Sequence, residues 1–264
     1  MSQFAAPRKS LGQNFLQDPN IINKIVSALT VGADDVVLEI GPGRGALTEK
    51  LLSLAKNLHL VEFDRDLVDY WRSREQGAAG LCVHSADILQ FDLTKITQSI
   101  DRSLKVIGNL PYNISSPVLF HLMKYADYID CQVVMLQKEV VQRMSASPGG
   151  KDYGRLSVML QQRYDIEYLF TVPPGAFFPP PKVESAIARL TPLKEIKHPV
   201  EDAVIFEKVV KQAFSQRRKT LRNTLKGLLS GEQIESLAID PAARAETLSV
   251  KDFVALANLV TNGV

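Results

Sequence analysis

The sequence predicts an α/β domain with a parallel sheet, followed by a small all-helical domain. From about residue 33, short runs rich in β-branched residues alternate with stretches whose apolar residues recur at helical spacing. Such alternation is typical of βαβ units, in which helices cover both faces of the sheet. Beyond about residue 192 only helical spacing continues. The chain has 264 residues, 45% of them apolar, which suits two unequal domains with packed cores.

The elements of the first domain follow from these runs. The predicted strands are 36–40, 58–64, 81–87, 104–110, 131–137, 166–172 and 183–190. The predicted helices are 46–56, 66–74, 116–125 and 155–163. A further helix is expected after Asp18, because aspartate caps helix N-termini and Pro19 suits the first helical position.

A linker is expected near residues 192–200, where the character of the sequence changes. We therefore place the first domain at 1–192 and the second at 193–264. The predicted helices of the second domain are 201–214, 216–229 and 248–261.

Composition excludes several classes of protein. No window approaches about 18 consecutive apolar residues, so no membrane-spanning helix is expected. The N-terminus has no apolar signal region, so a cytoplasmic protein is expected. Cys82 and Cys131 lie in apolar runs, and neither they nor the four histidines show metal-ligand spacing, so we expect buried thiols and no metal. The net charge of only +2, taken alone, argues against a nucleic-acid partner.

A glycine-rich turn, EIGPGRGALT (39–48), follows the first of these strands and opens a helix. Gly41, Gly43 and Gly45 allow a tight turn and a close approach of the backbone to a ligand. The G-x-G-x-G spacing departs from the dinucleotide pattern, which makes a pyrophosphate ligand less favourable. A turn that merely connects strand and helix remains the alternative.

Acidic residues lie at the ends of the next two predicted strands. Glu62 comes 21 residues after Gly41, where an acid can accept hydrogen bonds from both ribose hydroxyls, and Asp87 can accept from an adenine amino group. Each could instead be a solvated loop carboxylate. The first of three consecutive strands thus ends in a glycine loop, and the next two each end in an acid. This pattern favours an adenosine-based cofactor that does not require a phosphate-binding site. S-adenosylmethionine fits this pattern better than NAD.

The fourth strand end carries Asn109, Leu110, Pro111 and Tyr112. The lone pair of an amine on an aromatic ring is delocalised, and two acceptors for its hydrogens localise the pair toward a methyl donor. The Asn109 side-chain oxygen and the Leu110 carbonyl suit these two hydrogen bonds. Pro111 stiffens the loop, and Tyr112 offers a face on which an extruded base can stack. A turn with a core tyrosine is the alternative.

The chain resembles the KsgA-type family of bacterial small-subunit rRNA adenine dimethyltransferases from Lys9 to about Leu228. The motifs that carry this resemblance are KSLGQNFL (9–16), EIGPGRGALT (39–48), Glu62, SADILQFD (85–92), GNLPYNISSPVL (108–119), LQKEVVQRM (136–144), YGRLSV (153–158), FFPPPKVESA (177–186) and FSQRRKTLRNTL (214–225). The resemblance implies a class I S-adenosylmethionine-dependent methyltransferase fold (Rossmann-like) in 1–192 and a helical RNA-binding domain in 193–264. It also implies transfer of two methyl groups to N6 of each of two adjacent adenosines in the 3′-terminal hairpin of 16S rRNA. The expected partner is the small (30S) ribosomal subunit during its biogenesis, and a monomer is expected.

The resemblance also assigns site residues. Residues 1–32 are expected to form a flap and a lead helix, with the flap over the cofactor, and Phe177 is expected to close the target pocket opposite Tyr112, with core packing as its alternative. S-adenosyl-L-homocysteine is the expected product of the cofactor. The candidate cofactor-binding residues are Gln13, Asn14, Leu16, Gly41, Gly43, Gly45, Glu62, Asp87, Ile88 and Asn109.

A basic segment, residues 208–226, contains seven Lys and Arg residues and no acid. Without these seven, 24 basic residues face 29 acidic ones in the rest of the chain, so the small net charge conceals a segregated distribution. Like charges of this density favour contact with RNA phosphates, although a solvated helix face is the common alternative. The candidate RNA-binding residues, with the N-terminal arm included, are Arg8, Lys9, Lys211, Arg217, Arg218, Lys219 and Arg222.

Three other functions compete with this interpretation. A large-subunit rRNA methyltransferase of the antibiotic-resistance type is closely related, but the tracts at 177–186 and 214–225 favour the small-subunit enzyme. A catalytically idle assembly factor would keep the fold, but the intact loop at Asn109 and the acid at Glu62 speak against it. A DNA adenine methyltransferase fits less well, because such enzymes tend to carry a second proline in this loop.

Overall fold

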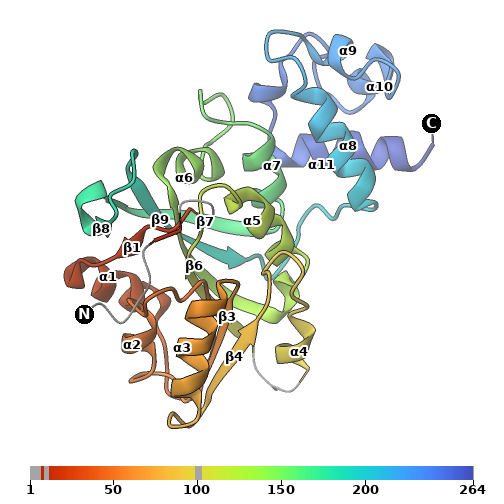
Figure 1. Ribbon diagram of the computed structural model, residues 1–264. Coiled ribbons are helices and arrows are strands. Elements are labelled where there is room, and N and C mark those ends of the chain that lie inside the picture. Colours follow the sequence, from red (N-terminus) through yellow and green to blue (C-terminus); the bar gives the residue numbers. More distant parts are fainter. Residues whose placement is uncertain (1–6, 9–11, 99–102, 264) are drawn as a thin grey trace. The chain divides into compact units, whose positions relative to one another are not determined.

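The computed structural model describes residues 7–8, 12–98 and 103–263. Its main sheet has seven strands in the order β4-β3-β2-β5-β6-β9-β7 (Figure 1). These strands are β2 (Val36–Ile40), β3 (Asn57–Glu62), β4 (Leu81–Ser85), β5 (Leu104–Asn109), β6 (Ile129–Gln137), β7 (Tyr164–Val172) and β9 (Ser185–Pro192). The pairs among β2 to β6 are parallel, and β9 joins β6 antiparallel. The predicted α/β fold is confirmed, with a mixed rather than wholly parallel sheet.

Helices cover both faces of this sheet. They are α1 (Pro19–Leu29), α2 (Thr48–Leu51), α3 (Arg65–Glu75), α4 (Thr94–Thr97) and α5 (Ser115–Met123), with 3₁₀ turns at Ala126–Tyr128 and Pro174–Ala176. The chain runs outward from β2 through β3 to β4, then returns to the other side of β2 at β5. Because such crossovers are right-handed, α2 and α3 lie on one face and α4 and α5 on the other (Figure 1). The reversal between β2 and β5 is a topological switch point, where α/β sheets bind ligands.

The start of α1 follows the expected capping chemistry. The Asp18 side chain accepts hydrogen bonds from the backbone N–H groups of Asn20 and Ile21, and Pro19 occupies the first turn. The apolar face of this helix packs into the core through Ile22, Ile25, Val26 and Leu29. The segment before it forms strand β1 (Phe15–Leu16), which pairs antiparallel with β8 (Phe177–Phe178).

The contacts of the chain divide it differently from the predicted domains. One unit is Met1–Val141 with Ile166–Pro192, and the other is Gln142–Asp165 with Leu193–Val264. One break between the units lies at 192/193, and residues 142–165 belong with the helical unit. The reason is local packing: the Tyr153 ring meets Phe214 edge-on, and Arg155 forms an ion pair with Glu207 at 2.6 Å.

The helical unit differs from the prediction over residues 216–236, where one predicted helix does not form and an unpredicted helix, Gly231–Ser236, is present. Its helices are α7 (Arg155–Gln161), α8 (Ala203–Ala213), α9 (Leu221–Thr224), α10 (Gly231–Ser236) and α11 (Val250–Thr261), with a 3₁₀ turn at Ala245–Thr247, and α6 (Lys138–Met144) spans its boundary. The prediction of a helix over residues 216–229 is wrong. The N–H groups of Leu221 and Arg222 donate to Ala243 and Pro241, and Gly227 adopts φ +88°, so only one turn of α-helix forms. Among the described residues, no helix is long and apolar enough to cross a membrane.

Candidate active site

A cavity of about 290 Å³ lies at the switch point, where the carboxyl ends of β2 to β5 meet the segment 12–16. All of its described lining residues belong to the first unit. Twelve predicted site residues line it: Gln13, Asn14, Leu16, Gly41, Gly43, Glu62, Asp87, Ile88, Asn109, Leu110, Pro111 and Tyr112. Residues far apart in the chain therefore share one site because parallel strands end at the same edge of the sheet.

The glycine loop uses its own amide groups internally. The Gly41 N–H donates to the Val61 carbonyl at 2.9 Å, and the Gly45 N–H donates to the Pro42 carbonyl at 2.9 Å. The Gly43 N–H donates to Glu62 Oε2 at 3.2 Å. Phosphate-binding loops instead turn such groups toward the ligand. The three glycine amides of this loop are thus committed within the protein, which disfavours a pyrophosphate ligand.

Gly45 does not line the cavity, which corrects its predicted place there. Its φ is +91°, and a Cβ atom at this position would lie 2.7 Å from the Trp71 ring. Trp71 is fully buried, and its Nε1–H donates to the Gly43 carbonyl at 2.9 Å. Gly45 therefore admits the ring that fixes the shape of the loop.

Glu62 is held by three backbone amides at the end of β3. Besides Gly43, the N–H groups of Phe63 and Asp64 donate to Oε1 at 2.8 and 2.9 Å. Burial raises the pKa of the Glu62 carboxyl, and these hydrogen bonds oppose that rise. Asp87 has a similar arrangement with one amide, because the Leu89 N–H donates to its Oδ1 at 2.9 Å. Both acids are thus oriented at the edge of the cavity.

Glu39 is a third acid in the cavity wall and was missed by the sequence analysis. It is the fourth residue of β2 and is 1% exposed, and the Thr48 hydroxyl donates to its Oε2 at 2.7 Å. Burial raises the pKa of this carboxyl to about 8, with the Thr48 hydrogen bond opposing the rise and the charge of Glu62 adding to it. A signal existed in the sequence, since an acid interrupts the apolar run VVLEI.

Glu39→Gln is expected to become more stable relative to the native chain as pH rises from 5 to 8. The native carboxyl keeps its proton up to about pH 8, whereas the unfolded one ionises near 4.5. The native state therefore binds more protons in this window, and its stability falls as pH rises. Gln retains an acceptor for Thr48 but cannot ionise. Urea unfolding at pH 5 and pH 8 measures the effect, with Glu195→Gln on the exposed linker as the matched control; equal differences at both pH values would contradict this assignment.

The loop after β5 is fixed by hydrogen bonds to neighbouring segments of the chain. The Asn109 Nδ2–H donates to the Asn14 carbonyl at 2.9 Å, which directs Oδ1 away from that carbonyl. The Leu110 N–H donates to the Met135 carbonyl of β6 at 3.1 Å. The Tyr112 hydroxyl lies 2.7 Å from Ser185 Oγ, and burial raises the pKa of this phenol. These hydrogen bonds fix the geometry of the loop.

The segment 12–16 lies against the glycine loop. The Phe15 ring lies 3.2 Å from the Cβ position of Gly43 and 4.3 Å below the Arg44 guanidinium. The Gln13 Nε2–H donates to Asp64 Oδ2 at 2.9 Å. Gly12, with φ +64°, approaches Asn113 and Pro111, where a Cβ atom would lie 3.3 Å from the Asn113 Oδ1.

The predicted role of Arg8 in RNA binding is not supported by its contacts. Its guanidinium pairs with Asp64 at 2.9 Å and with Asp66 at 2.5 Å, so it ties the N-terminal arm to the residues after Glu62. Lys9 lies outside the described residues.

Phe177 also lies elsewhere than predicted. It is 4% exposed, pairs with Leu16 across the β1–β8 ladder and belongs to the hydrophobic core cluster. It is not among the described residues that line the cavity. Phe177 therefore packs in the core, the alternative considered for it from the sequence. The neighbouring Phe178 is 51% exposed.

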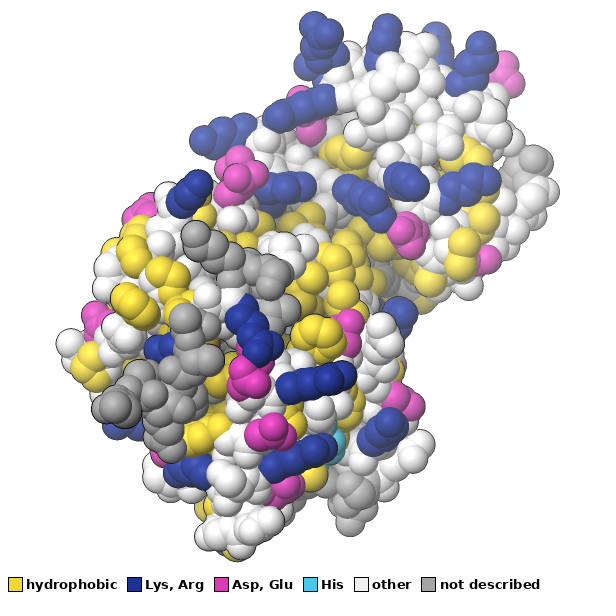
Figure 2. All heavy atoms as spheres, in the orientation of Figure 1, with side chains coloured by type: hydrophobic (Ala, Val, Ile, Leu, Met, Phe, Trp, Pro, Cys, Tyr) yellow, Lys and Arg dark blue, Asp and Glu magenta, His cyan; other side chains and the backbone are white. Residues whose placement is uncertain are grey.

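The basic segment 208–226 is exposed on the helical unit. Figure 2 shows Lys and Arg side chains gathered over this unit. Its seven basic residues are all exposed: Lys208, Lys211, Arg217, Arg218, Lys219, Arg222 and Lys226. Arg217 pairs with Glu246 at 3.3 Å and Arg222 with Glu235 at 3.9 Å, whereas Lys211, Arg218 and Lys219 have no ion-pair partner within the part of the chain described. Arg218 precedes α9 whereas Arg222 lies within it, so these two residues do not share a helix face.

Comparison with known proteins decides the family. The sequence profile of the ribosomal RNA adenine dimethylases matches residues 5–262. The chain belongs to the ribosomal RNA adenine dimethylase family. A relative from Chromobacterium violaceum, named ribosomal RNA small subunit methyltransferase A, is 51% identical over 252 residues, which cover 96% of this chain and 95% of the relative. The resemblance stated from the motifs is thereby confirmed.

Two solved structures have the same fold as this dimethylase. A dimethyladenosine transferase from Plasmodium falciparum has a TM-score of 0.79 and 28% identity, covering 92% of this chain and 95% of that one. The 23S rRNA methyltransferase ErmE has a TM-score of 0.70 and 25% identity, covering 94% of this chain and all of that one. The predicted class I methyltransferase fold is thus confirmed.

Proposed function

We propose that this dimethylase transfers methyl groups from S-adenosylmethionine to N6 of two adjacent adenosines in the 3′-terminal hairpin of 16S rRNA. Its acceptor is the small ribosomal subunit during biogenesis. Support for the small subunit comes from the 51% identity to a small-subunit methyltransferase, against 25% identity to a 23S rRNA methyltransferase. The large-subunit alternative shares the fold and is an outcome of the tests below.

The chemistry of the cavity fits S-adenosylmethionine. This cofactor carries ribose hydroxyls and an adenine amino group as hydrogen-bond donors, and Glu62 and Asp87 line the cavity as acceptors. Glu62 accepts hydrogen bonds from the ribose hydroxyls, and Asp87 accepts one from the adenine amino group. The cofactor has no phosphate, in keeping with glycine amides that already have acceptors. When bound, it supplies an electrophilic methyl group and leaves as S-adenosylhomocysteine.

The target adenine is expected to leave its stack and enter beside Asn109. Asn109 Oδ1 and the Leu110 carbonyl accept the two hydrogens of N6, which localises the nitrogen lone pair toward the methyl donor. Tyr112 stacks on the base, and such stacking contributes ~1–3 kcal/mol of binding free energy per base. The N6 proton departs after positive charge has developed on nitrogen, so no strong general base is required. The observation that carries this mechanism is the Asn109 Nδ2–H bond to Asn14, which leaves Oδ1 as the acceptor.

RNA binding is assigned to the basic segment, through phosphate contacts that position the substrate without reading its sequence. The double charge reversal Arg218→Glu with Lys219→Glu is expected to weaken binding of small subunits. It should also reduce the slope of log K against log salt by about 1 for each phosphate that the variant no longer neutralises. Filter binding across a range of salt concentrations measures both quantities.

A matched control separates this local effect from the change in net charge. Lys194→Glu with Lys197→Glu makes the same charge change on exposed residues of the same unit, outside the basic segment. We expect this control to keep most of the salt slope. An equal loss of binding and of salt slope in both double variants would show that the basic segment is a solvated surface and not the RNA-binding site.

The acceptor itself is tested with separated subunits that lack the modification. Each is incubated with methyl-labelled S-adenosylmethionine, and the label in the rRNA is counted. We expect label in the small subunit. Label in the large subunit would favour the resistance-type alternative, and no label in either would favour the idle assembly factor.

A further inference from the structure

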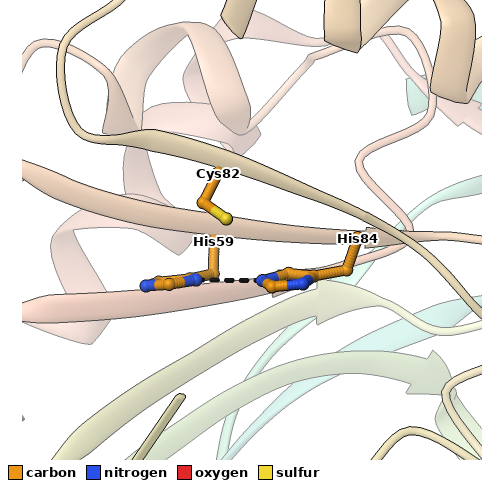
Figure 3. A group of neighbouring side chains, drawn as sticks. All are labelled: His59, Cys82 and His84. Atoms are coloured by element: carbon orange, nitrogen blue, oxygen red, sulfur yellow. Dashed lines mark hydrogen bonds between the residues drawn. The ribbon is translucent and has the colours of Figure 1, made fainter. Parts of the chain in front are cut away.

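Three side chains that can bind a metal lie together at the edge of the main sheet. His59 comes from β3, and Cys82 and His84 come from β4, the edge strand. The ladder pairs His59 with Cys82, and residues two apart on a strand share a face. Figure 3 shows the two imidazole rings side by side, with the thiol directed toward them. The three side chains therefore converge on one point.

The distances suit a small metal ion. His59 Nδ1 and His84 Nε2 are 3.0 Å apart, and ligand atoms of the three residues all lie within 4.8 Å of one another. Tetrahedral zinc, with bonds of about 2.0–2.1 Å to nitrogen and 2.3 Å to sulfur, separates its ligand atoms by about 3.3–3.6 Å. The two nitrogens nearly have this separation already, and the sulfur needs a shift on the order of 1 Å, within reach of a side-chain rotation.

The cluster is not part of the main core. Leu58, Leu60, Leu81 and Val83 alternate with it along the two strands and belong to the hydrophobic cluster on the opposite face. The cluster residues themselves are only partly buried. The polar triad thus occupies the sheet edge, on the face covered by α4 and α5, where an ion can enter.

The surroundings of the cluster favour coordination. The Val83 N–H donates to Glu75 Oε1 at 2.9 Å, which places a carboxylate beside the edge strand. Its negative charge offsets part of the charge that a divalent ion would add, against the opposing charge of Lys95 on α4.

We propose that His59, Cys82 and His84 bind one Zn²⁺ ion, with a water molecule as the fourth ligand. The Cys82 thiol gives up its proton to solvent on binding. The ion links β3 to β4, the two strands whose carboxyl ends lead to Glu62 and Asp87 of the cavity. The link does not depend on the methyl-transfer function.

Titration of the full chain, free of any histidine tag, with ZnCl₂ in a calorimeter tests this site. We expect one ion per chain. Cys82→Ser and His84→Gln should each weaken the affinity by at least about tenfold, since even outer-shell partners of zinc contribute this much. Cys131→Ser is the matched control, because Cys131 is the other cysteine and is also partly buried. With Co²⁺ in place of zinc, thiolate-to-metal absorption should appear in the native chain and in Cys131→Ser, and be missing in Cys82→Ser.

A second measurement uses the native chain alone and does not depend on how the variants fold. Iodoacetamide alkylation is followed by mass spectrometry at both cysteines, with and without Zn²⁺. The proposal expects Zn²⁺ to protect Cys82 and leave Cys131 unchanged. An unchanged modification of Cys82, or equal zinc affinity in the native chain and Cys82→Ser, would overturn it.

Discussion

Asn109→Ala is expected to lower the rate of methyl transfer by about 10²- to 10³-fold, as for loss of a group that acts on developing charge in the transition state. The variant loses the Oδ1 acceptor for the N6 amine. It also loses the Nδ2–H bond to the Asn14 carbonyl, which joins the loop to the flap. Binding of small subunits should stay within about twofold, because the basic segment supplies the phosphate contacts. Single-turnover methylation and filter binding measure the two effects separately.

Two further variants make this prediction specific. Asn109→Asp keeps acceptor oxygens but removes the donor to Asn14, so a partial loss of rate is expected if the flap contact only positions the acceptor. Asn23→Ala removes an exposed asparagine of α1 and should leave the rate unchanged. Full activity in Asn109→Ala would show that the Asn109 side chain does not take part in methyl transfer.

Glu62→Gln is expected to weaken cofactor affinity by about 10- to 100-fold. Hydrogen bonds to a charged group contribute ~1.5–3 kcal/mol, and the ribose hydroxyls would lose a carboxylate acceptor. The amide NH₂ would also face the Gly43 or the Phe63 and Asp64 N–H groups as a second donor. The glycine loop should therefore loosen, and the free energy of unfolding should fall along with the affinity. Calorimetric titration with S-adenosylhomocysteine and urea unfolding report the two losses.

The comparison of Glu62→Gln with Glu39→Gln separates binding from folding. Both remove a buried carboxyl from the same cavity, but Glu39 is satisfied by the Thr48 side chain rather than by the glycine loop. We expect Glu39→Gln to keep its stability at pH 7 and above. Unchanged cofactor affinity in Glu62→Gln would show that a residue other than Glu62 binds the ribose hydroxyls.

The parallel strands and their terminal polar residues could be predicted from the sequence. The predicted strand 36–40 coincides with β2, and the strands at 81–87 and 104–110 each extend at most two residues past β4 and β5. β2 is buried along its whole length and β5 over most of its length, so these strands appear as short, mostly apolar runs. Because their carboxyl ends converge, the positions of Glu62, Asp87 and Asn109 around one cavity followed from their places in the chain.

Features that depend on long-range packing could not be predicted. The helix expected at 216–229 fails because backbone donors of Leu221 and Arg222 find acceptors at Ala243 and Pro241. Phe177 shares a sequence tract with an exposed aromatic, and only its pairing with Leu16 decides that its ring enters the core. The His59, Cys82 and His84 cluster escaped notice because the register of two strands, not a local motif, brings it together.

We expect the loop at Asn109 to hold the target adenine while two neighbouring adenosines of small-subunit RNA are methylated. The most direct test of this expectation is to incubate unmodified small subunits with S-adenosylmethionine and the native chain or Asn109→Ala. The modified nucleosides are then identified and mapped by mass spectrometry. We predict N6,N6-dimethyladenosine at two adjacent positions in the 3′-terminal hairpin of 16S rRNA with the native chain, and unmodified adenosines with the variant. Methyl groups at any other position, or equal modification by both proteins, would contradict this account.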